Sequence, residues 1–513
     1  MSRYNTKATA KTQTVTNHQG GESYKLDPKM EMVSILATGF DNTYYEKLSD
    51  RETRFKDLIV TIAKKEPEFV AKALVYARSV MGQRSVSQFG AVALTPLLSG
   101  RSVARKFFSK RDRKQNKGGI VFRLDDMLEI VACYQHFNPG KPLPNSMKKG
   151  FKEALENADA YELAKYQGKN RSISLVDVVN LVHPAPKENM QETFKQLMTG
   201  TLKQFNTVED KNTQAGQEVA AKVKAGTITK EQAEVQLKEA KEANYAELIK
   251  TRKIGYLALL RNLRNILQTS DNSSLINEAC EILTDAKMIK QSLVFPHQID
   301  IALEVLIQEV GAQKALPFIK ACDKAYELAI PNLTELFSHG RTAVVFDSSG
   351  SMDSAIQLAN RKQGSKRAIE KAALIAATLA KGINADVYHF ANSTQRIPFN
   401  PMDSVNTLKN QFLAKQGAVG YGTEFNSIFK TIGSNYDRVF VISDMQGKSY
   451  LDRIAYKNMH VYSIDIVGYG TTMFKPGDKV YQLFGYTAEM YELVKKVELD
   501  PKAIIKAIEA IEI

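Results

Sequence analysis

Cysteine is scarce in this sequence, and its placement excludes two kinds of stabilised fold. The 513 residues contain three cysteines, Cys133, Cys280 and Cys322. They lie far apart, form no CxxC pair and are odd in number. This arrangement argues against a disulfide framework and against a zinc site, and it predicts a protein of a reducing compartment.

Long hydrophobic runs are also missing. The sequence has no stretch of 18 consecutive apolar residues and no amino-terminal signal pattern, which are the marks of membrane-spanning and secreted chains. We therefore expect a soluble, cytoplasmic protein. Hydrophobic residues still make up 43% of the chain, so it can bury a sizeable core, and its length suggests roughly two to four domains.

A hydrolytic site is not evident either. The seven histidines are spread along the chain, and the acidic residues form no clear nuclease-type carboxylate cluster. The sequence predicts a binding protein and not an enzyme.

Positive charge is present in excess and is concentrated in one region. The formal net charge is +14, and residues 51–150 alone carry 20 Lys and Arg against 8 Asp and Glu. A concentrated basic surface is typical of a protein that binds a polyanion, usually nucleic acid. The alternative, a solvated face that serves solubility, would spread the charge more evenly.

Three regions differ in their periodicity. Residues 1–22 are polar and indicate a flexible basic arm. Residues 23–338 show helical spacing of apolar residues and predict a solenoid of paired helices; examples are Arg54–Ala63, Glu68–Val80, Val86–Leu98 and Asp125–Gln135. Within them, residues 207–250 are rich in Ala, Lys, Glu and Gln and predict a projecting helical hairpin, with a capping box at Thr229–Gln232.

Residues 339–513 alternate between strand and helix patterns. This rhythm predicts an α/β domain with a doubly wound parallel sheet. The expected strands are Thr342–Phe346, Ala385–Phe390, Arg438–Ser443, Val461–Val467 and an edge strand at Val480–Phe484, and the expected helices are Lys366–Lys381, Glu424–Ile432 and Ala488–Val497.

Hard oxygen ligands follow two of these strands. Asp347, Ser349 and Ser351 form a D-x-S-x-S string, Thr423 precedes a helix, and Asp444 ends another strand. Because the carboxyl ends of parallel strands meet at one sheet edge, these side chains can converge. Carboxylate and hydroxyl oxygens suit a small divalent cation, most plausibly Mg²⁺. The alternative is a helix amino terminus capped by Ser and Asp without a metal.

Three groups of basic residues are candidates for phosphate contact, which depends on salt and is largely blind to sequence. The first is the cluster Arg101, Arg105, Lys110, Arg111, Arg113, Lys114, Lys117 and Arg123. The second is Lys165, Lys169 and Arg171 with His183, although a histidine before a proline is more often a helix-terminal hydrogen-bonding residue. The third is Arg261 and Arg264, which share a helix face and either point into a channel or bind neighbouring helix ends.

The combination of motifs resembles a known family. The D-x-S-x-S string with Thr423 and Asp444 is similar to the metal-ion-dependent adhesion site of von Willebrand factor A domains. The preceding part resembles the TROVE module of the Ro autoantigen family, in the segments Thr43–Tyr45, Gly82–Ser87, Val179–Pro184 and Ala258–Leu263.

This resemblance implies a monomeric ring of HEAT-like helical repeats, closed with help from the A domain. It implies binding of small structured Y RNAs on the outer surface and of single-stranded 3′ ends of misfolded non-coding RNAs in the hole. It also implies an exoribonuclease partner. By resemblance, Lys165, Arg171 and His183 correspond to the Y RNA contacts, and the metal ligands are those given above.

Two other functions are kept as alternatives. One is a protein-adhesion scaffold that acts through the metal of the A domain. The other is a metal-dependent nuclease that uses Asp347 and Asp444.

Overall fold

The chain folds into two compact units in the computed structural model. The structure describes residues 14–40, 43–112, 114–202, 208–292, 294, 296–329, 340–353, 355–356 and 366–513. The α/β unit comprises Met1–Leu58 with Pro331–Lys506, and the helical unit comprises Ile59–Ile330 with Ala507–Ile513. The first 58 residues thus belong with the carboxyl-terminal unit, whereas the sequence analysis places residues 23–58 in the helical region.

The elements of the first 330 residues are β1 (Thr14–Thr16), β2 (Glu22–Lys25), α1 (Pro28–Thr38), α2 (Leu48–Ala63), α3 (Pro67–Ser79), α4 (Ser85–Leu98), α5 (Val103–Phe107), β3 (Arg111–Asp112), β4 (Lys117–Gly118), α6 (Asp125–Phe137), α7 (Asn145–Glu156), α8 (Ala160–Lys165), α9 (Leu175–Val182), η1 (Glu188–Met190), α10 (Gln191–Met198), α11 (Val208–Lys224), α12 (Lys230–Lys250), α13 (Tyr256–Thr269), α14 (Ser273–Leu283), α15 (Ala286–Ser292), α16 (Pro296–Val310) and α17 (Ala312–Ala329).

The elements that follow are β5 (Thr342–Asp347), η2 (Gly350–Asp353), β6 (Ala355–Ile356), β7 (Lys366–Arg367), α18 (Ala368–Ile383), β8 (Asp386–Phe390), β9 (Thr394–Ile397), α19 (Val405–Leu413), α20 (Phe425–Ile432), β10 (Arg438–Ser443), η3 (Arg453–Tyr456), β11 (His460–Asp465), β12 (Thr471–Thr472), β13 (Val480–Phe484), α21 (Ala488–Val497) and α22 (Ala503–Glu509).

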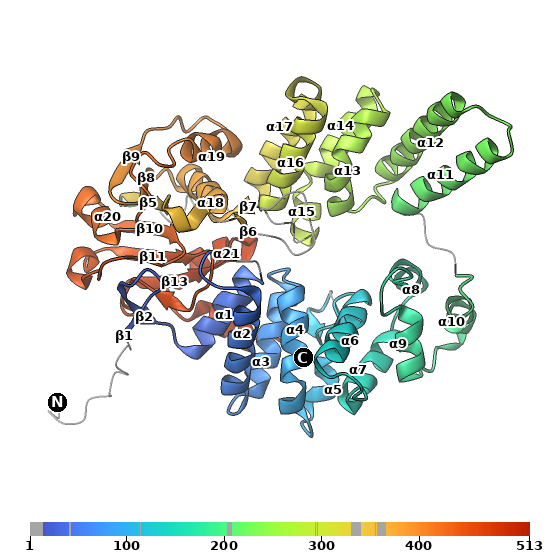
Figure 1. The fold of residues 1–513 in the computed structure, drawn as a ribbon, viewed down its shortest axis with the longest axis horizontal. Helices are drawn as coiled ribbons and strands as arrows, with labels where there is room; N and C mark the ends of the chain where they lie inside the picture. The colour runs from blue at the N-terminus through green and yellow to red at the C-terminus, as the bar shows by residue number, and fades with distance from the viewer. Residues whose placement is uncertain are drawn as a thin grey trace. The chain divides into compact units, whose positions relative to one another are not determined.

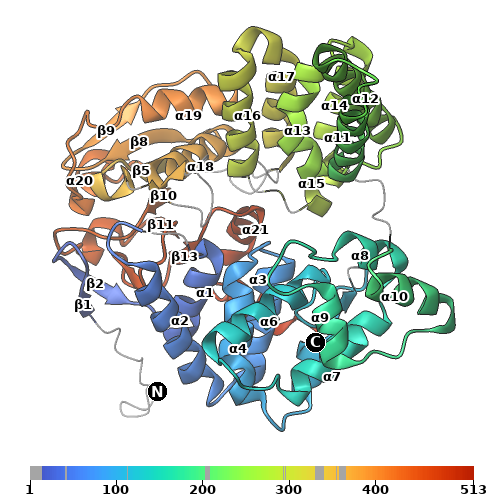
Figure 2. The ribbon, with the colours of Figure 1, turned by 45° about the vertical axis from the view of Figure 1, so that its right-hand side comes forward.

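The helical unit is built from helices that pack on near neighbours in the chain. Helix α3 packs on α4 and α4 on α6, and later α13 packs on α14 and α16 on α17; Figure 2 shows α13, α14, α16 and α17 gathered together. Each helix buries one apolar stripe. In α13 the buried residues include Leu259, Leu263 and Ile266, which recur at the spacing of one helix face. The predicted helical character of this region is confirmed.

The predicted hairpin at residues 207–250 is also confirmed as two helices, α11 and α12, which pack on one another. The Thr229 side chain accepts from the Gln232 backbone amide at 3.2 Å, and the Gln232 side chain accepts from the Thr229 amide at 2.9 Å. Gly226, with φ of +68°, allows the chain to turn between the two helices.

A six-stranded sheet forms the centre of the α/β unit, with strand order β13-β11-β10-β5-β8-β9 (Figure 1). All pairs are parallel except β8 with β9. Every residue of β5 is buried, because this central strand is covered on both faces. The predicted strands are confirmed, while the antiparallel edge strand β9 and helix α19 were not predicted.

Side chains of β5 alternate between two layers of helices. Ala343 and Val345 join the core that contains Phe425 and Ile428 of α20. On the other face, the ring of Phe346 lies 6.0 Å from that of Phe412 in α19, and α18 packs along the same strand. The sheet is therefore covered on both faces, and its residues that carry chemistry lie at the strand ends.

The amino-terminal segment differs from the expected flexible arm over residues 14–22. Strands β1 and β2 form a hairpin that pairs with β12, in the sheet order β1-β2-β12. Thr14 pairs with Tyr24, and Tyr24 also pairs with Thr472. The hairpin is ordered because distant partners from the α/β unit complete its backbone hydrogen bonds, which composition alone does not reveal.

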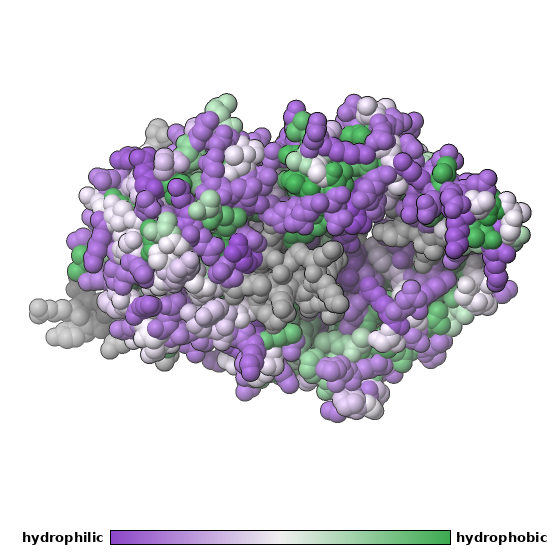
Figure 3. Space-filling view, turned by 45° about the horizontal axis from the view of Figure 1, so that its top comes forward, coloured by the Kyte–Doolittle hydropathy of each residue, from purple (hydrophilic) through white to green (hydrophobic). Residues whose placement is uncertain are grey.

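The surface is predominantly hydrophilic, and apolar residues appear in small separate groups on the face shown in Figure 3. None of the helices in the described residues combines the length and apolar character needed to span a bilayer. Cys133, Cys280 and Cys322 are free thiols.

Candidate functional site

The predicted oxygen ligands lie at one edge of the sheet. Asp347 is the last residue of β5, and Asp444 directly follows β10, its parallel neighbour. The D-x-S-x-S loop meets the loop before α20, since the Gly350 amide donates to the Tyr421 carbonyl oxygen at 2.9 Å. Thr423 lies in that second loop. All five predicted ligands are buried, and the structure brings them to the same edge.

Short hydrogen bonds fix the carboxylate of Asp347. The Ser349 amide donates to Asp347 Oδ1 at 2.9 Å, and the Ser443 hydroxyl donates to Asp347 Oδ2 at 2.6 Å. The hydroxyls of Ser349 and Ser351 lie 3.3 Å apart. Ser443 was not predicted as a site residue. The signal that could have found it is its position at the end of a parallel strand, one residue before Asp444. The loop continues into the 3-10 turn η2.

The donor set fits a divalent cation. Asp444 Oδ2 is buried and has no hydrogen-bond partner among the residues that the structure describes, which costs free energy unless a cation or proton satisfies it. Burial raises the pKa of Asp347 to about 6. Burial and the neighbouring Asp347 raise the pKa of Asp444 well above its ordinary value. Two carboxylates and three hydroxyls are the hard oxygen ligands that Mg²⁺ prefers, and a cation would remove the repulsion between the acids.

The tip of the amino-terminal hairpin lies over this edge. Asn17 Nδ2 donates to the Gly447 carbonyl oxygen at 2.9 Å, and the His18 amide donates to Gln446 Oε1 at 2.9 Å. Gln19 Nε2 donates to Thr423 Oγ1 at 2.9 Å. A Cβ atom on Gly21 would lie only 2.2 Å from the Gly447 carbonyl oxygen, so the hairpin is in close backbone contact with the loop after β10.

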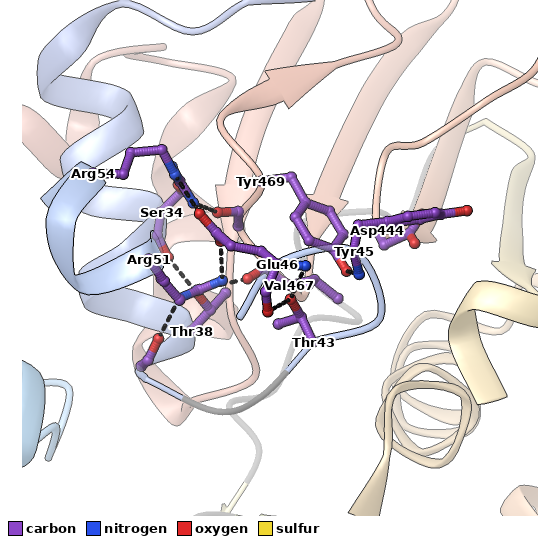
Figure 4. A network of polar contacts seen from close by, with 12 residues as sticks. Ser34, Thr38, Thr43, Tyr45, Glu46, Arg51, Arg54, Asp444, Val467 and Tyr469 are labelled. Carbon is purple, nitrogen blue, oxygen red and sulfur yellow. Dashed lines mark hydrogen bonds and ion pairs between the residues drawn. The ribbon is translucent and has the colours of Figure 1, made fainter. Parts of the chain in front are cut away.

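Tyr45 completes the cover from a second segment. Its pKa is raised by burial and by the carboxylate of Asp444, and Figure 4 shows its side chain beside that carboxylate. The His18 and Tyr45 rings stack with centroids 5.3 Å apart, and the Tyr45 amide donates to the Tyr469 hydroxyl at 3.2 Å. Sequence reasoning missed Gln19 and Tyr45 as residues of this site, although Gln19-Gly20-Gly21 between two β-branched or aromatic stretches is a turn signal.

Two arginines hold the segment that carries Tyr45 (Figure 4). Arg51 donates to the carbonyl oxygens of Gly39 at 2.9 Å and Val467 at 2.7 Å. Arg54 forms a two-pronged ion pair with Glu46, with distances of 2.8 and 2.9 Å. Glu46 directly follows Tyr45, so these bonds fix the position of the tyrosine relative to β11 and its loop.

The basic cluster at residues 101–123 is only partly available for a ligand. Arg101, Arg105, Lys114 and Lys117 are exposed, and Arg105 and Lys117 pair with Glu153 and Glu512. Lys110 is half-buried and pairs with Glu162. Arg113 lies outside the described residues.

Arg111 does not lie on the surface as a phosphate-binding residue should. Its side chain is buried and donates to the carbonyl oxygens of Asn116 at 2.6 Å and Gly118 at 2.7 Å. Burial lowers the pKa of its guanidinium. Arg111 therefore holds the β3–β4 loop in place. The sequence does not indicate this role, because Arg111 lies within a run of other basic residues.

A second group of cations gathers around α6, α8 and α9. Arg123 pairs with Asp125 through two bonds of 3.0 and 2.9 Å, and its guanidinium lies 5.5 Å from the centre of the Tyr166 ring. Lys165 lies 5.7 Å from the same ring and is exposed. Arg171 contacts Glu129 and lies 4.0 Å from Asp125.

Buried acids in this group set the orientation of the cations. Burial alone would raise the pKa of Asp125, but Arg84 and Arg123 bring it below its ordinary value. Asp126 is fully buried and accepts from Arg78, Arg84 and Gln88. Asp125 therefore remains ionised. Both acids orient the guanidinium groups, while Lys165 and Lys169 remain exposed.

His183 ends α9 as the sequence predicted. It adopts a left-handed conformation with φ of +48°, and its amide donates to the Val179 carbonyl oxygen at 2.9 Å. Its imidazole is exposed. Helix α9, whose eight residues span about 12 Å, lies between Arg171 and His183 in the chain.

Arg261 and Arg264 lie on α13. Arg261 is exposed and Arg264 is half-buried, with Nη2 donating to Asn265 Oδ1 at 3.3 Å. Neither is part of the group around Asp125.

The comparisons with known proteins agree with this architecture. Residues 24–246 match the family model of the TROVE domain. Over these residues the chain is similar to TROVE domains. The matched segment begins in β2 and ends in α12, so it includes α6, α8 and α9 with their cations.

Two curated proteins that share similarity are much longer. Telomerase protein component 1 of Rattus norvegicus is 20% identical over 332 residues, and that of Mus musculus is 22% identical over 332 residues. Each match covers 53% of this chain and 12% of the longer protein, so this chain spans only a small part of their length.

A solved structure shares the fold. The crystal structure of the Deinococcus radiodurans Ro (RSR) protein superposes with a TM-score of 0.58 at 12% identity, covering 92% of this chain and 100% of that chain. The helical region followed by a carboxyl-terminal α/β sheet region is therefore common to both.

Proposed function

We propose that this chain is an RNA-binding protein of ribonucleoprotein particles, without catalytic activity of its own. The observation that carries the proposal is the group of cations in the segment that is similar to TROVE domains. Arg84, Arg123, Lys165 and Arg171 stand against Asp125 and Glu129, which leaves two positive charges in excess. Arg78 and Asp126 form a buried pair beneath them. Exposed Lys169 and His183 extend this basic surface.

The chemistry of this surface suits folded RNA. Guanidinium groups held in fixed orientations by buried acids bind phosphate with little loss of side-chain entropy. Duplex RNA is bound mainly through its shape, phosphates and 2′-hydroxyls. The proposed ligands are small structured Y-type RNAs and the single-stranded 3′ ends of misfolded non-coding RNAs. An exoribonuclease that acts on such RNA would be a further partner, in the cytoplasm.

The fold likeness supports two further parts of the proposal. We infer that the helices are HEAT-like repeats, closed into a monomeric ring by the α/β unit. We also infer that this unit is a von Willebrand factor A domain, with Mg²⁺ held by Asp347, Ser349, Ser351, Thr423 and Asp444. Bound there, the cation supplies positive charge between two buried acids.

Titration of a labelled structured RNA tests the RNA-binding proposal. The double variant Lys165→Ala, His183→Ala should weaken binding at least about tenfold at fixed salt and flatten the dependence of affinity on salt concentration, because contacts with phosphates release fewer counterions. Lys238→Ala removes one exposed lysine of α12 and should leave affinity within about twofold. Unchanged affinity in the double variant would refute this surface as the RNA site. Asp347→Ala should leave RNA binding intact. It should cause no loss of ribonuclease turnover relative to the wild type, because we propose that the chain is not a nuclease.

A further inference from the structure

The amino-terminal hairpin touches the proposed metal site at the point where an external ligand would enter. Gln19 is 404 positions before Thr423 in the chain, yet its carboxamide nitrogen lies 2.9 Å from the Thr423 hydroxyl oxygen. This contact is a feature of the α/β unit alone, since both segments belong to it.

The backbone around Gln19 is fixed independently of that contact. Asn17 Oδ1 accepts from the amides of Gln19 at 2.9 Å and Gly21 at 3.3 Å, which closes the turn. Asn17 Nδ2 and the His18 amide bind the loop after β10. The turn therefore presents the Gln19 side chain to the site in a set position, as a preorganised ligand requires.

The Gln19 carboxamide offers an oxygen of the right kind. Amide carbonyl oxygens are hard ligands for Mg²⁺ and Ca²⁺. A half-turn about the last side-chain bond exchanges the positions of Nε2 and Oε1, because the two ends of a carboxamide are nearly the same size. Oε1 would then occupy the position that Nε2 holds now beside Thr423, and it could face the cation as an acceptor.

We propose that Gln19 is the chain's own ligand for the divalent cation at this site, so that the cation fastens the amino-terminal hairpin to the edge of the sheet. This inference rests on the proposed metal site. Gln19 and Tyr45 lie against Thr423 and Asp444, two of the proposed ligands. The bound cation would therefore stabilise the α/β unit itself. Binding of a carboxylate from another protein, as in the adhesion alternative, would require the hairpin to move away from the site first.

The test measures cation binding and hairpin protection separately. Mn²⁺ affinity is measured by electron paramagnetic resonance, and amide hydrogen exchange of residues 14–25 is measured by mass spectrometry with and without Mg²⁺. In the wild-type chain we expect Mg²⁺ to slow exchange in this segment. Gln19→Ala should abolish that slowing and weaken Mn²⁺ binding about tenfold, while Gln19→Glu should restore both because it keeps an oxygen ligand.

Two controls separate this inference from the metal proposal. Gln411→Ala removes an exposed glutamine of α19 that binds Asp403 and should behave as the wild type. Asp347→Ala should lose Mn²⁺ binding. Wild-type Mn²⁺ binding with no effect on residues 14–25, or unchanged Mg²⁺ protection in Gln19→Ala, would overturn the role of Gln19 and leave the metal site standing. Absence of Mn²⁺ binding in the wild type would overturn both.

Discussion

The guanidinium of Arg51 lies 2.7 Å from the carbonyl oxygen of Val467, a residue 416 positions further along the chain. Arg51 is almost completely buried, and the same Nη2 atom also donates to the Thr38 hydroxyl at 2.5 Å. This side chain joins α1, α2 and the loop after β11. It explains why the first 58 residues fold with the α/β unit.

Replacing Arg51 by Ala should destabilise the α/β unit strongly. The change leaves buried carbonyl oxygens of Gly39 and Val467 without this donor, and we expect a loss on the order of 3 kcal/mol in unfolding free energy. Urea unfolding followed by circular dichroism measures it. Lys56→Ala, an exposed change in the same helix, should cost less than about 0.5 kcal/mol. Equal effects of the two changes would contradict the role given to Arg51.

Asp126 should be essential to the helical unit for a related reason. It accepts from the backbone amides of Phe122 at 3.1 Å and Arg123 at 2.9 Å, as well as from Arg78. Asp126→Ala leaves the buried Arg78 guanidinium without its partner, and we expect a loss of roughly 3–5 kcal/mol. The exposed Glu68→Gln change in α3 is the control. A shift of the unfolding midpoint no larger than that of the control would refute this prediction.

Substitutions of Arg111 and Lys114, which belong to the same basic cluster, should have different effects: the first on stability and the second on RNA binding. Arg111→Ala should lower the thermal unfolding midpoint, because its guanidinium closes the β3–β4 loop. Lys114→Ala should leave the midpoint unchanged and reduce the salt dependence of RNA binding by about one phosphate contact. Calorimetry and RNA titrations on both variants provide the comparison. The assignment fails if Arg111→Ala is as stable as the wild type.

Asp465 should make the α/β unit less stable as pH rises from about 4 to 6. Burial raises the pKa of its carboxyl to about 6, whereas an unfolded Asp has a pKa of about 4. The folded state therefore holds the proton of Asp465 more tightly than the unfolded state does. The contribution of this proton to the free energy of unfolding is complete below about pH 4 and is lost as pH rises through 6. Its Oδ2 atom is buried and has no hydrogen-bond partner within the described part of the chain.

Asp465→Asn should remove this dependence and stabilise the chain at pH 7 by on the order of 2 kcal/mol relative to the wild type. At pH 4 the two proteins should be nearly equal. Asp478→Asn, at an exposed position, is the control. Urea unfolding midpoints at pH 4, 5, 6 and 7 test the prediction, and a wild-type curve parallel to that of Asp465→Asn would contradict it.

Local sequence patterns predicted much of the α/β unit. The expected strands Arg438–Ser443 and Val480–Phe484 and the helix Ala488–Val497 coincide with β10, β13 and α21. A strand buried on both faces reads as a continuous apolar run, which needs no knowledge of distant partners. The convergence of Asp347 and Asp444 followed from the same topology, since neighbouring parallel strands end at one edge.

The tertiary structure decided what the local pattern left open. Composition predicted that residues 14–22 belong to a basic arm, yet they form part of a hairpin at a sheet edge. Composition also presented Arg111 as one cation among many, yet its buried side chain holds the β3–β4 loop. In both cases the position of the segment or side chain depends on its contacts with other residues. The spacing of apolar residues in the sequence does not encode which residues those are. The sequence by itself determined the helices, the strands and the ligand-bearing strand ends, because these depend on neighbouring residues. Only the folded chain decided that Gln19 meets Thr423 and that Arg51 meets Val467, because those contacts depend on the three-dimensional path of about 400 intervening residues.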